Sequence, residues 1–593
     1  GWGKKKTSSF ARTYSKFKKV PYLALEDGFL RSVGFGSEGW KCLSMIVDEE
    51  GIYYDSENGS ALENLIKDND FSDELIDRAK SSISFIQQNG ITKYNVGLDV
   101  GESSFELPSG KNILLIDQTE NDASVIYGSR GREDFERMFK YAREKFPEAN
   151  ILIKTHPEVI KGNKQGYLSK FFRKVGVYPI SEPINLYSLI EHVEAVFTVT
   201  SLSGMEALIA GAKVYCFGKP FYAGWGLTKD FRNLGGRNKQ LSLEELFAAS
   251  YILYPRYLNP YSKQITSIEN TLDLINWLKN KYKKHLKIYH CRGISYWKRD
   301  FITKFIKTPY NEVKFYSEDK DAVDNAAYYG GEVLVWASKE SINLPDLCKS
   351  KEVNLIRMED GFIRSAGLGS DLTIASSQVV DRKGIYYNCE TESELENLIN
   401  TIEIDEKQKK RAADLIQNII SNSITKYNLK GKELKYSFPQ DKKIILVPGQ
   451  VENDASISVN HGKVKTNLRL LEVVRKKNPD AFVIYKPHPD VVSGNRQGHV
   501  AKRDVLKYSD IILEDVVISK LVGRVDEVHT ISSLVGFEAL LRKKKVVTYG
   551  KPFYAGWGLT KDYYKIERRQ KKVDIETLVY AALIEYPIYY DHI

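Results

Sequence analysis

GKPFYAGWGLTKD occupies residues 218–230 and returns, unchanged, at residues 550–562. The two copies are 332 residues apart (550 − 218). Solenoids and propellers repeat every 20 to 50 residues or so, and this spacing is far longer (about the size of an enzyme module). The sequence therefore predicts two related modules in series. Each candidate site in one module can be compared with a second copy in the same chain.

The composition is typical of a globular protein, with 42% hydrophobic and 28% charged residues among 593. No apolar run reaches the roughly 18 residues of a transmembrane helix. The opening residues GWGKKKTSSF also lack the apolar core of a secretory signal. The five cysteines are scattered without CxxC spacing, which argues for a reducing compartment and against a disulfide framework or zinc site.

The net charge of +10 indicates an anionic partner. Charge alone leaves open a nucleic acid, a phosphorylated substrate, an acidic sugar or a membrane surface. Nucleic acid is disfavoured because the chain has no RNP, zinc-finger or basic-helix signature.

Three further tracts recur at nearly the same spacing. They are VPYLALEDGFLRS (20–32) with VNLIRMEDGFIRS (353–365), GIYYDSENGSALENLI (51–66) with GIYYNCETESELENLI (384–399), and ITKYN at 91–95 and 424–428. The Ser-x-x-Glu patterns that begin at Ser60 and Ser393 predict a capped helix. Together these tracts predict one domain in each module.

A second domain is predicted in each module from apolar strands that alternate with helices. The expected strands are 113–116, 151–153, 195–199, 213–217, 444–447, 482–485 and 528–531, and a helix is expected at 132–145. This alternation predicts βαβ units and parallel sheets. Ligands bind at the carboxyl ends of such strands, so the motifs there predict a cleft. No GxGxxG fingerprint follows any of these expected strands, which disfavours a dinucleotide cofactor.

The second module has an additional opening segment, predicted as a strand at 287–289, a helix at 296–306 and a strand at 333–336. Trp2 corresponds to Trp336 in this comparison. The first module thus begins inside its first domain and lacks about fifty residues there, by domain-size reasoning. We expect the chain to be truncated at its N-terminus.

A histidine–proline pair follows a predicted strand and a lysine in both modules. The residues are Lys154 and His156 in KTHPE, and Lys486 and His488 in KPHPD. A lone His-Pro pair would most simply be a turn, but this one recurs in the same context. Because Lys and His donate charged hydrogen bonds to phosphate, we interpret these residues as nucleotide or phosphate contacts.

Hydroxyl residues and a glycine open a predicted helix after a later strand. They are Ser201, Ser203 and Gly204 in the first module, and Ser532, Ser533 and Gly536 in the second. Backbone N–H groups and hydroxyls in this position bind anions, although N-capping accounts for the same residues, and both roles can hold together. Glu206 and Glu538, inside this helix, are assigned either to ribose hydroxyls or to a surface ion pair.

The tract Gln-x-Glu-Asn-Asp-Ala-Ser recurs after the first strand of this domain and contains Asp122 and Asp454. A carboxylate at a strand end in a cleft suits a nucleophile or a base. Helix capping is the alternative, but it does not require the whole tract to recur. Gln118 and Gln450 of the same tract are assigned to substrate binding.

Glu-Asp-Gly-Phe ends a strand in the first domain of each module and predicts the opposite wall of the cleft. A turn would account for Glu-Asp-Gly alone. The tract also follows an apolar strand and carries an arginine, which favours a site. Glu26 and Glu359 are the candidates here, with Arg31 and Arg364 expected to bind an acidic sugar.

The repeated stretch of thirteen residues combines glycines, aromatics and lysines. A structural loop would explain it, but its identity in two otherwise divergent copies indicates a shared ligand contact. We expect Lys219 and Lys551 to meet negative charge on the ligand. Phe221, Tyr222 and Trp225 are expected to pack one domain onto the other.

Taken together, EDGFLRS, QTENDAS, KTHPE, TSLSG and GKPFYAGWG resemble the KpsC family of capsular polysaccharide β-Kdo transferases of Gram-negative bacteria. The resemblance covers nearly the whole chain, and both the motif order and the duplication match. It implies an α/β fold of two tandem GT-B-like modules, each of two Rossmann-like domains with a cleft between them. On this basis residues 1–95 and 285–428 are acceptor domains, and 96–284 and 429–593 are donor domains.

The resemblance also implies the reaction. CMP-β-Kdo would be the donor and a lysophosphatidylglycerol-linked oligo-Kdo the acceptor, with (2→4) transfer by the first module and (2→7) by the second. A retaining mechanism makes Asp122 and Asp454 the nucleophiles. Glu26 and Glu359 would be general bases, and the lysine–histidine pairs would stabilise the leaving CMP. No metal or cofactor is expected, because cationic side chains can take the phosphate charge.

The same resemblance places the protein in the cytoplasm, peripherally at the inner face of the inner membrane, with other capsule-assembly proteins as partners. Two alternatives remain open. One is a CDP-alcohol phosphotransferase of cell-surface polymer synthesis, which can share a His-Pro nucleotide contact. The other is a non-catalytic polysaccharide-export scaffold, which the presence of both Asp tracts disfavours.

Overall fold

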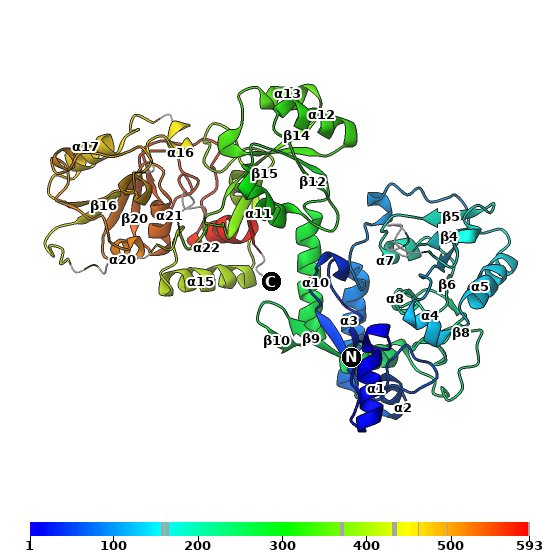
Figure 1. Ribbon diagram of the computed structural model, residues 1–593. Coiled ribbons are helices and arrows are strands. Elements are labelled where there is room, and N and C mark those ends of the chain that lie inside the picture. The colour runs from blue at the N-terminus through cyan, green and yellow to red at the C-terminus, as the bar shows by residue number, and fades with distance from the viewer. Residues whose placement is uncertain are drawn as a thin grey trace. The chain divides into compact units, whose positions relative to one another are not determined.

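The computed structural model describes residues 1–155, 159, 165–367, 373–429, 434, 436–459, 462–494 and 496–590. The chain forms two compact units, the first ending at His285 and the second beginning at Leu286. Each unit contains two β-sheets with helices packed against them (Figure 1).

The second domain of the first unit is a six-stranded parallel sheet. Its order is β5 (Val177–Ile180), β4 (Asn150–Lys154), β3 (Asn112–Ile116), β6 (Val196–Thr198), β7 (Val214–Cys216) and β8 (Lys229–Asp230). This is the doubly wound order 3-2-1-4-5-6 of Rossmann-like folds. All five residues of β3 are buried, as expected when helices cover both faces of a parallel sheet. Those helices are α4 (Ala123–Gly128), α5 (Arg132–Lys145), α7 (Leu186–Ile190) and α8 (Ser203–Ile209).

The second unit repeats this domain with the same strand order. The strands are β18 (Ile511–Ile512), β17 (Phe482–Lys486), β16 (Ile444–Pro448), β19 (Glu527–Thr530), β20 (Lys545–Thr548) and β21 (Lys561–Asp562). The helices are α16 (Ala455–Ser458), α17 (Asn467–Lys477), α18 (Pro489–Val492), α19 (Lys502–Val505), α20 (Ile518–Gly523) and α21 (Leu534–Leu541).

The first domain of the second unit has a mixed sheet. Its order is β12 (Val313–Phe315), β11 (Tyr289–Arg292), β13 (Glu332–Trp336), β14 (Asn354–Asp360), β15 (Ser377–Asp381) and β22 (Pro587–Tyr589). The first four strands are parallel, and β15 and β22 are antiparallel to their neighbours. The helices are α11 (Tyr296–Ile306), α12 (Asp319–Tyr329), α13 (Leu344–Ser350), α14 (Glu394–Thr401), α15 (Glu406–Ser421) and α22 (Ile575–Val579).

The first domain of the first unit differs from the expected Rossmann-like form. Its four strands, β1 (Ala24–Asp27), β2 (Ser44–Asp48), β9 (Pro255–Asn259) and β10 (Gln264–Thr266), are all antiparallel. The parallel part of the equivalent sheet in the second unit comes from residues 289–336, and only Trp2 matches it here. Trp2 makes a parallel bridge to Leu25, just as Trp336 pairs with Met358. The helices are α1 (Ser9–Lys18), α2 (Ala61–Asp68), α3 (Asp73–Asn89), α9 (Leu243–Phe247) and α10 (Ile268–Lys283).

The end of each module crosses back to the first domain. A π-helical turn, at Ala248–Leu253 and again at Tyr580–Glu585, precedes strands β9 and β22. β9 then pairs with β2, and β22 with β15. Residues assigned from sequence to the end of each second domain therefore complete the sheet of the first domain.

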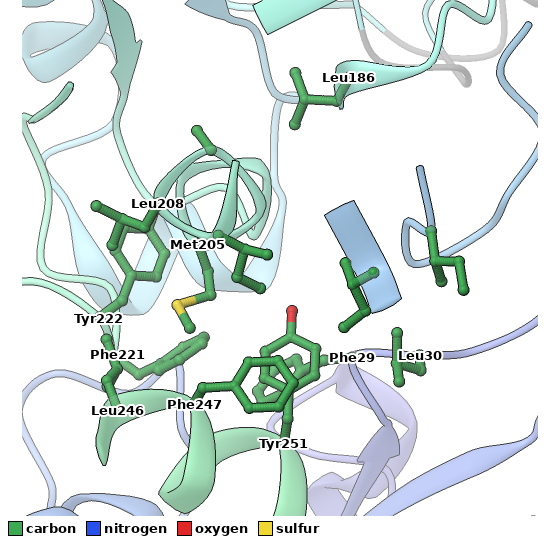
Figure 2. Close-up of a cluster of buried hydrophobic side chains, with 14 of the residues drawn as sticks. Phe29, Leu30, Leu186, Met205, Leu208, Phe221, Tyr222, Leu246, Phe247 and Tyr251 are labelled. Atoms are coloured by element: carbon green, nitrogen blue, oxygen red, sulfur yellow. The ribbon is translucent and has the colours of Figure 1, made fainter. Parts of the chain in front are cut away.

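One hydrophobic core joins the two domains of the first unit (Figure 2). Phe29, from the Glu-Asp-Gly-Phe tract, stacks on Phe221 of the repeated stretch with ring centroids 4.9 Å apart. Tyr251 of the π-helical turn packs on Phe29 at 5.3 Å. In the second unit Phe362 and Phe553 make the equivalent contact at 4.4 Å. This packing fixes how the two domains of a unit face each other.

Candidate active site

A cavity lies between the two domains of each unit, with a volume of about 380 Å³ in the first and about 1620 Å³ in the second. Equivalent candidate residues line both. They are Glu26, Gln118, Asp122, Lys154, Ser201, Ser203 and Glu206 in the first unit, and Glu359, Arg364, Gln450, Asp454, Lys486, His488, Ser532, Ser533 and Glu538 in the second. Among the described lining residues, Arg31, Lys219 and Lys551 do not occur. His156 lies outside the described residues.

Gln118 connects β3 and β6, the strands between which the sheet order reverses. Its Nε2 donates to Thr200 Oγ1 (3.1 Å), and its Oε1 accepts from Thr200 N (3.0 Å). Gln450 likewise accepts from Ser532 N (3.0 Å) and donates to Ser532 Oγ (3.1 Å). Ligands of doubly wound sheets bind in the crevice at this reversal. Both amide groups are bonded to protein and help to shape the crevice, and the substrate contact expected from sequence stays a prediction.

Asp122 and Asp454 cap helices α4 and α16 and also line the cavities. Asp122 Oδ1 accepts from Ser124 N (2.8 Å) and from Ser124 Oγ (2.6 Å). Asp454 Oδ1 accepts from Ser456 N (2.9 Å). The cap holds one carboxylate oxygen of each aspartate and leaves the other, Oδ2, without a hydrogen bond from any described residue. Such a carboxylate is oriented and still able to act as a nucleophile.

Glu26 and Glu359 lie near the ends of β1 and β14, on the opposite wall. Burial of the Glu359 carboxyl, with repulsion from Asp360, raises its pKa to about 7, although Lys298 and Lys426 act in the other direction. A carboxyl that titrates near the working pH is suited to general-base catalysis.

Arg31 and Arg364 are held by the aspartates that follow these glutamates. Arg31 Nε donates to Asp27 Oδ2 (2.8 Å), and Arg364 Nε donates to Asp360 Oδ2 (2.7 Å). Arg364 is only 2% exposed. Each guanidinium group thus fixes the aspartate before it, and the contact with an acidic sugar expected from sequence stays a prediction; Arg364 lines the cavity of its unit, whereas Arg31 is not among the described lining residues.

Lys154 and Lys486 end strands β4 and β17, and each amine is anchored to a backbone carbonyl. Lys154 Nζ donates to Ile184 O (2.6 Å), and Lys486 Nζ donates to Glu514 O (2.8 Å). Burial lowers the pKa of both amines, that of Lys154 to about 8. An ammonium group has three N–H donors, so each lysine retains donors for a ligand.

The hydrogen bond that His488 accepts determines which ring nitrogen carries the proton. Its Nδ1 accepts a hydrogen bond from Asp490 N (3.2 Å), and burial lowers its pKa. The neutral ring therefore carries its proton on Nε2. His488 can thus donate a hydrogen bond to an oxygen in the cavity.

All four serines line the cavities, but a serine caps the helix only in the second unit, because α8 has Leu202 at its N-cap and no side-chain cap. Ser201 Oγ accepts from Ser203 N (3.2 Å), and Ser533 Oγ accepts from Val535 N (3.3 Å) at the start of α21. A hydroxyl that accepts in this way still has its own O–H to donate.

Glu206 and Glu538 connect the two domains of their units. Each is only 7% exposed, so neither forms the surface ion pair considered from sequence. Glu206 Oε1 accepts from Lys93 N (2.9 Å), and Glu538 Oε1 accepts from Lys426 N (3.1 Å). Both lysines belong to the recurring ITKYN tract of the first domain. Burial raises the pKa of both carboxyls, that of Glu538 to about 7.

The repeated stretch supports the site from behind. Tyr222 and Trp225 are 0% exposed, as are their counterparts in the second unit. The Tyr222 hydroxyl donates to Ser201 O, which fixes the start of the serine turn. Gly224 and Gly226 adopt φ angles of 89° and 88°, which only glycine tolerates well. The packing role expected for its aromatics is what the structure describes, while Lys219 and Lys551 contribute no described lining to the cavities.

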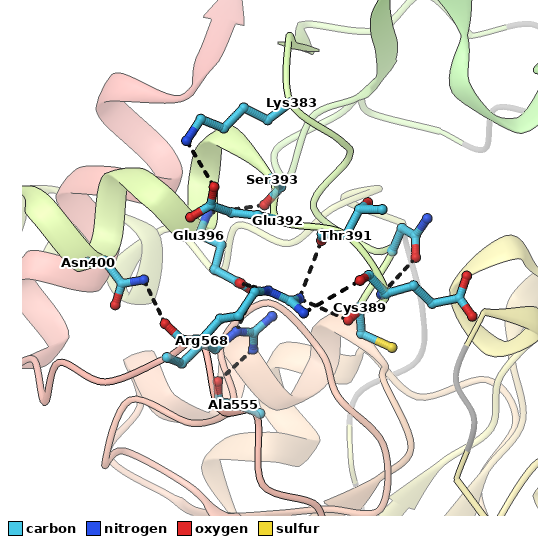
Figure 3. A network of polar contacts seen from close by, with 12 residues as sticks. Lys383, Cys389, Thr391, Glu392, Ser393, Glu396, Asn400, Ala555 and Arg568 are labelled. Atoms are coloured by element: carbon cyan, nitrogen blue, oxygen red, sulfur yellow. Dashed lines mark hydrogen bonds and ion pairs between the residues drawn. The ribbon is translucent and has the colours of Figure 1, made fainter. Parts of the chain in front are cut away.

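Sequence reasoning missed an arginine seven residues after each copy of this stretch. Arg569 Nη1 donates to Pro552 O (2.5 Å) and Ala555 O (2.6 Å), and its Nε pairs with Glu396 Oε2 at 2.9 Å. The neighbouring Arg568 pairs with the other oxygen of Glu396, Oε1, at 2.6 Å (Figure 3). Arg237 makes the equivalent contacts in the first unit. The pair clamps the stretch to the first domain.

Glu63 and Glu396 were interpreted from sequence as the final residues of capping boxes. Ser60 and Ser393 do cap their helices, accepting from Glu63 N and Glu396 N. The glutamate side chains bind Arg237 and Arg569 instead of closing the box. The signal for this clamp was the recurrence of the arginine at the same distance in both modules.

Lys93 and Lys426 also line the cavities and were not singled out as site residues. The available signal was the recurrence of ITKYN. Within the described ranges, no three metal-ligating side chains of the His, Cys, Asp or Glu type gather in one place. No described helix has both the length and the apolar character needed to cross a bilayer.

Two α/β domains around a crevice, repeated along the chain, define a protein of two tandem GT-B-like modules. The chain belongs to the family described as "Capsule polysaccharide biosynthesis protein", whose model matches residues 1–257, 331–431 and 408–593.

Known relatives agree with this membership. The chain is 41% identical over 600 aligned positions to the capsule polysaccharide modification protein LipA of Neisseria meningitidis serogroup A, covering 99% of this chain and 85% of that protein. It is 44% identical to a solved structure described as Thermosulfurimonas dismutans KpsC, beta Kdo 2,4 transferase, covering 46% of this chain and 86% of the other, with a TM-score of 0.45. A second structure, described as the beta Kdo 2,7 transferase of the same protein, is 37% identical, covering 52% and 93%, with a TM-score of 0.43.

Proposed function

We propose that the protein is a retaining glycosyltransferase that moves Kdo from CMP-β-Kdo to a growing capsule-linker glycolipid. The observation that carries this proposal is the same pair of carboxylates in both units. Asp122 and Asp454 stand on one wall of a cavity, and Glu26 and Glu359 stand on the other. Family membership supports capsule polysaccharide synthesis, and the Kdo donor comes from the motif resemblance.

The proposed reaction has two displacement steps. First, the free oxygen of Asp454 attacks the anomeric carbon, a C–O bond to aspartate forms, and the bond to CMP breaks with its electron pair leaving on the phosphate. Second, the acceptor hydroxyl attacks the same carbon, the aspartyl ester breaks, and the hydroxyl proton passes to Glu359. Two inversions retain the configuration. Asp122 and Glu26 play these roles in the first unit.

The leaving CMP needs compensation for its charge. His488 offers an Nε2–H, and Lys154 and Lys486 offer ammonium donors that are anchored by carbonyls. His156 is proposed as the equivalent of His488 by its place in the sequence. These groups let us propose a reaction that needs no metal.

The acceptor is also a proposal. We expect the two units to share one donor and to differ in the hydroxyl that they present, giving (2→4) linkage in the first and (2→7) in the second. We expect a lysophosphatidylglycerol-based lipid to bear the acceptor sugars, which would bring the protein to the inner face of the inner membrane beside other capsule-assembly proteins.

Replacement of the two aspartates tests this function. Asp122→Asn should abolish one linkage and Asp454→Asn the other, each by about a thousandfold or more, because loss of a nucleophile removes the route itself. The double variant should transfer nothing, while the exposed-site control Asp77→Asn should transfer normally. The products are identified by mass spectrometry and linkage analysis. A wild-type protein inert toward CMP-Kdo, or one that consumes CDP-glycerol instead, would contradict the proposal.

A further inference from the structure

The ITKYN tract forms the same rigid turn in both units. Asn95 and Asn428 adopt left-handed φ angles of 54° and 49°. In the first turn, Asn95 Oδ1 accepts from Thr92 N (2.9 Å), and Asn95 Nδ2 donates to Ser32 O (2.9 Å). Asn428 makes the equivalent bonds in the second unit. Asparagine tolerates this backbone conformation better than other non-glycine residues.

The lysine of each turn is held through its backbone from both domains. Lys93 N donates to Glu206 in the second domain, and Lys93 O accepts from Arg31 N (3.0 Å) and Ser32 N (3.2 Å) in the first. Lys426 is held in the same way by Glu538, Arg364 and Ser365. The backbone of an ordinary surface turn is not tied on both sides in this manner, so the position of the lysine side chain is specified.

Lys154 and Lys486 each use one N–H donor on a backbone carbonyl, whereas the amines of Lys93 and Lys426 make no such bond to a described residue. Both side chains line their cavities. Within the part of the chain that the structure describes, neither Nζ has a hydrogen bond or an ion pair. The groups around Lys426 include the carboxylates of Asp360 and Asp454 and the phenol of Tyr386.

A cation beside Lys426's carboxylate neighbours is needed to balance their negative charge when an anionic donor binds. Glu359, Asp360 and Asp454 line the same cavity as Lys426, and an anionic donor that enters would be repelled by them. Arg364 does not relieve this repulsion at the donor, because Asp360 already occupies it. Lys298 also lines this cavity, with its Nζ 3.8 Å from the centroid of the Trp336 ring. Lys426, whose Nζ has no hydrogen bond or ion pair to a described residue, lies on the acceptor-domain side, away from the strand ends of the donor domain that would hold the nucleotide.

We infer that Lys93 and Lys426 bind the carboxylate of the donor sugar, so that they select a sugar acid and hold its anomeric carbon between nucleophile and base. Kdo is a 2-ulosonic acid, in which the carboxylate is bonded to the anomeric carbon itself. This inference rests on the proposed function and names the amines that would recognise the carboxylate of the donor.

The charge state of the amines supports the assignment. Burial alone would lower the pKa of Lys426, but the surrounding tyrosines and aspartates outweigh it and the pKa is raised. Burial also lowers the pKa of Lys93, but a larger opposite effect raises it, from Tyr94, Tyr53, Asp27 and Glu26. Both lysines therefore remain cationic wherever the enzyme is active.

The test uses the full chain with Asp122→Asn, so that only the second unit transfers sugar. Lys426→Met and Lys426→Arg are compared with Lys410→Met, an exposed lysine on α15. Steady-state kinetics with CMP-Kdo and calorimetry with CMP alone are the two readouts. Lys426→Met should lower kcat/KM about 10- to 100-fold, the loss expected for one charge-assisted hydrogen bond, and should leave CMP affinity within about twofold. Lys426→Arg should recover part of the activity, and Lys410→Met should change neither quantity.

Several outcomes would overturn the inference. Equal losses of CMP affinity and kcat/KM would mean that the amine serves the phosphate. A kcat/KM within twofold of the parent would mean that it serves neither group. If Lys426→Met does not fold, Lys426→Gln and the mirrored Lys93→Met in an Asp454→Asn chain give the same comparison. A parent chain that transfers no Kdo at all would instead contradict the proposed function.

Discussion

Several side chains of this site are oriented by a hydrogen bond or an ion pair from a neighbouring residue. Ser456 fixes one oxygen of Asp454, Arg364 fixes Asp360, and Asp490 sets the tautomer of His488. A reacting group that is oriented before the substrate arrives loses less entropy in the reaction. In the proposed reaction, Asp454 Oδ2 and the carboxyl of Glu359 are the groups that meet the substrate.

The pH dependence of the second unit follows from Glu359. Its pKa of about 7 means that the carboxylate needed as a base is lost as the pH falls below this value. In an Asp122→Asn chain, kcat/KM should therefore rise tenfold per pH unit below about 7 and become flat above it. Glu359→Gln should be nearly inactive, and its remaining kcat/KM should no longer rise with pH below about 7. A flat profile between pH 5 and pH 8, with Glu359→Gln still active, would contradict the role.

The acidic residues of the site could be predicted from sequence, because each follows an apolar strand and recurs in the second module. The roles of the cations could not. Arg364 and Lys426 are both basic residues near a carboxylate motif, yet Arg364 pairs with Asp360, whereas Lys426 Nζ has no hydrogen bond or ion pair within the described residues. Which carbonyl or carboxylate an amine reaches depends on contacts between distant segments, and the order of residues does not reveal them.

At the scale of elements, each cavity depends on the clamp between the repeated stretch and helix α2 or α14. Arg569 is 8% exposed and Glu396 is 4% exposed. The arginine also donates to two loop carbonyls. The stretch thus positions the serine turn and joins the domains, and its Pro220 and Phe221, like Pro552 and Phe553, also line the cavities.

Arg569→Ala should destabilise the second unit by about 3–5 kcal/mol, because it leaves Glu396 and two carbonyls buried without partners. Denaturant unfolding followed by fluorescence measures this, with the exposed Lys565→Ala as the matched control. Arg237→Ala should have the corresponding effect on the first unit. A loss below about 1 kcal/mol for Arg569→Ala would mean that the clamp is not needed for stability.

Strands with continuous apolar runs, such as β3 and β16, were predictable because both faces of a parallel sheet are buried. Strands β9 and β22 were not predicted. Each begins with a proline after a π-helical turn and pairs with a sheet formed some 200 residues earlier. Pairing of this kind depends on tertiary contacts, so the crossing back to the first domain was missed.

At the scale of the whole molecule, two units carry the same reactive groups around cavities of different size. The larger cavity, of about 1620 Å³, is extended by Trp297, Lys298 and Trp336 of the segment that opens the second module. The duplication was evident from sequence alone. The difference between the cavities was not, because volume depends on how the domains of each unit pack.

The central claim is that Asp122 and Asp454 form a covalent bond to the donor sugar. The direct measurement is peptide mass spectrometry after brief exposure of the Glu26→Gln, Glu359→Gln chain to CMP-Kdo, where loss of the bases should slow release of the sugar. The account predicts a Kdo adduct on the peptides that contain Asp122 and Asp454, and no adduct at either position once it is changed to Asn. Turnover by the wild-type chain with no adduct on either aspartate, or an adduct on another residue, would contradict it.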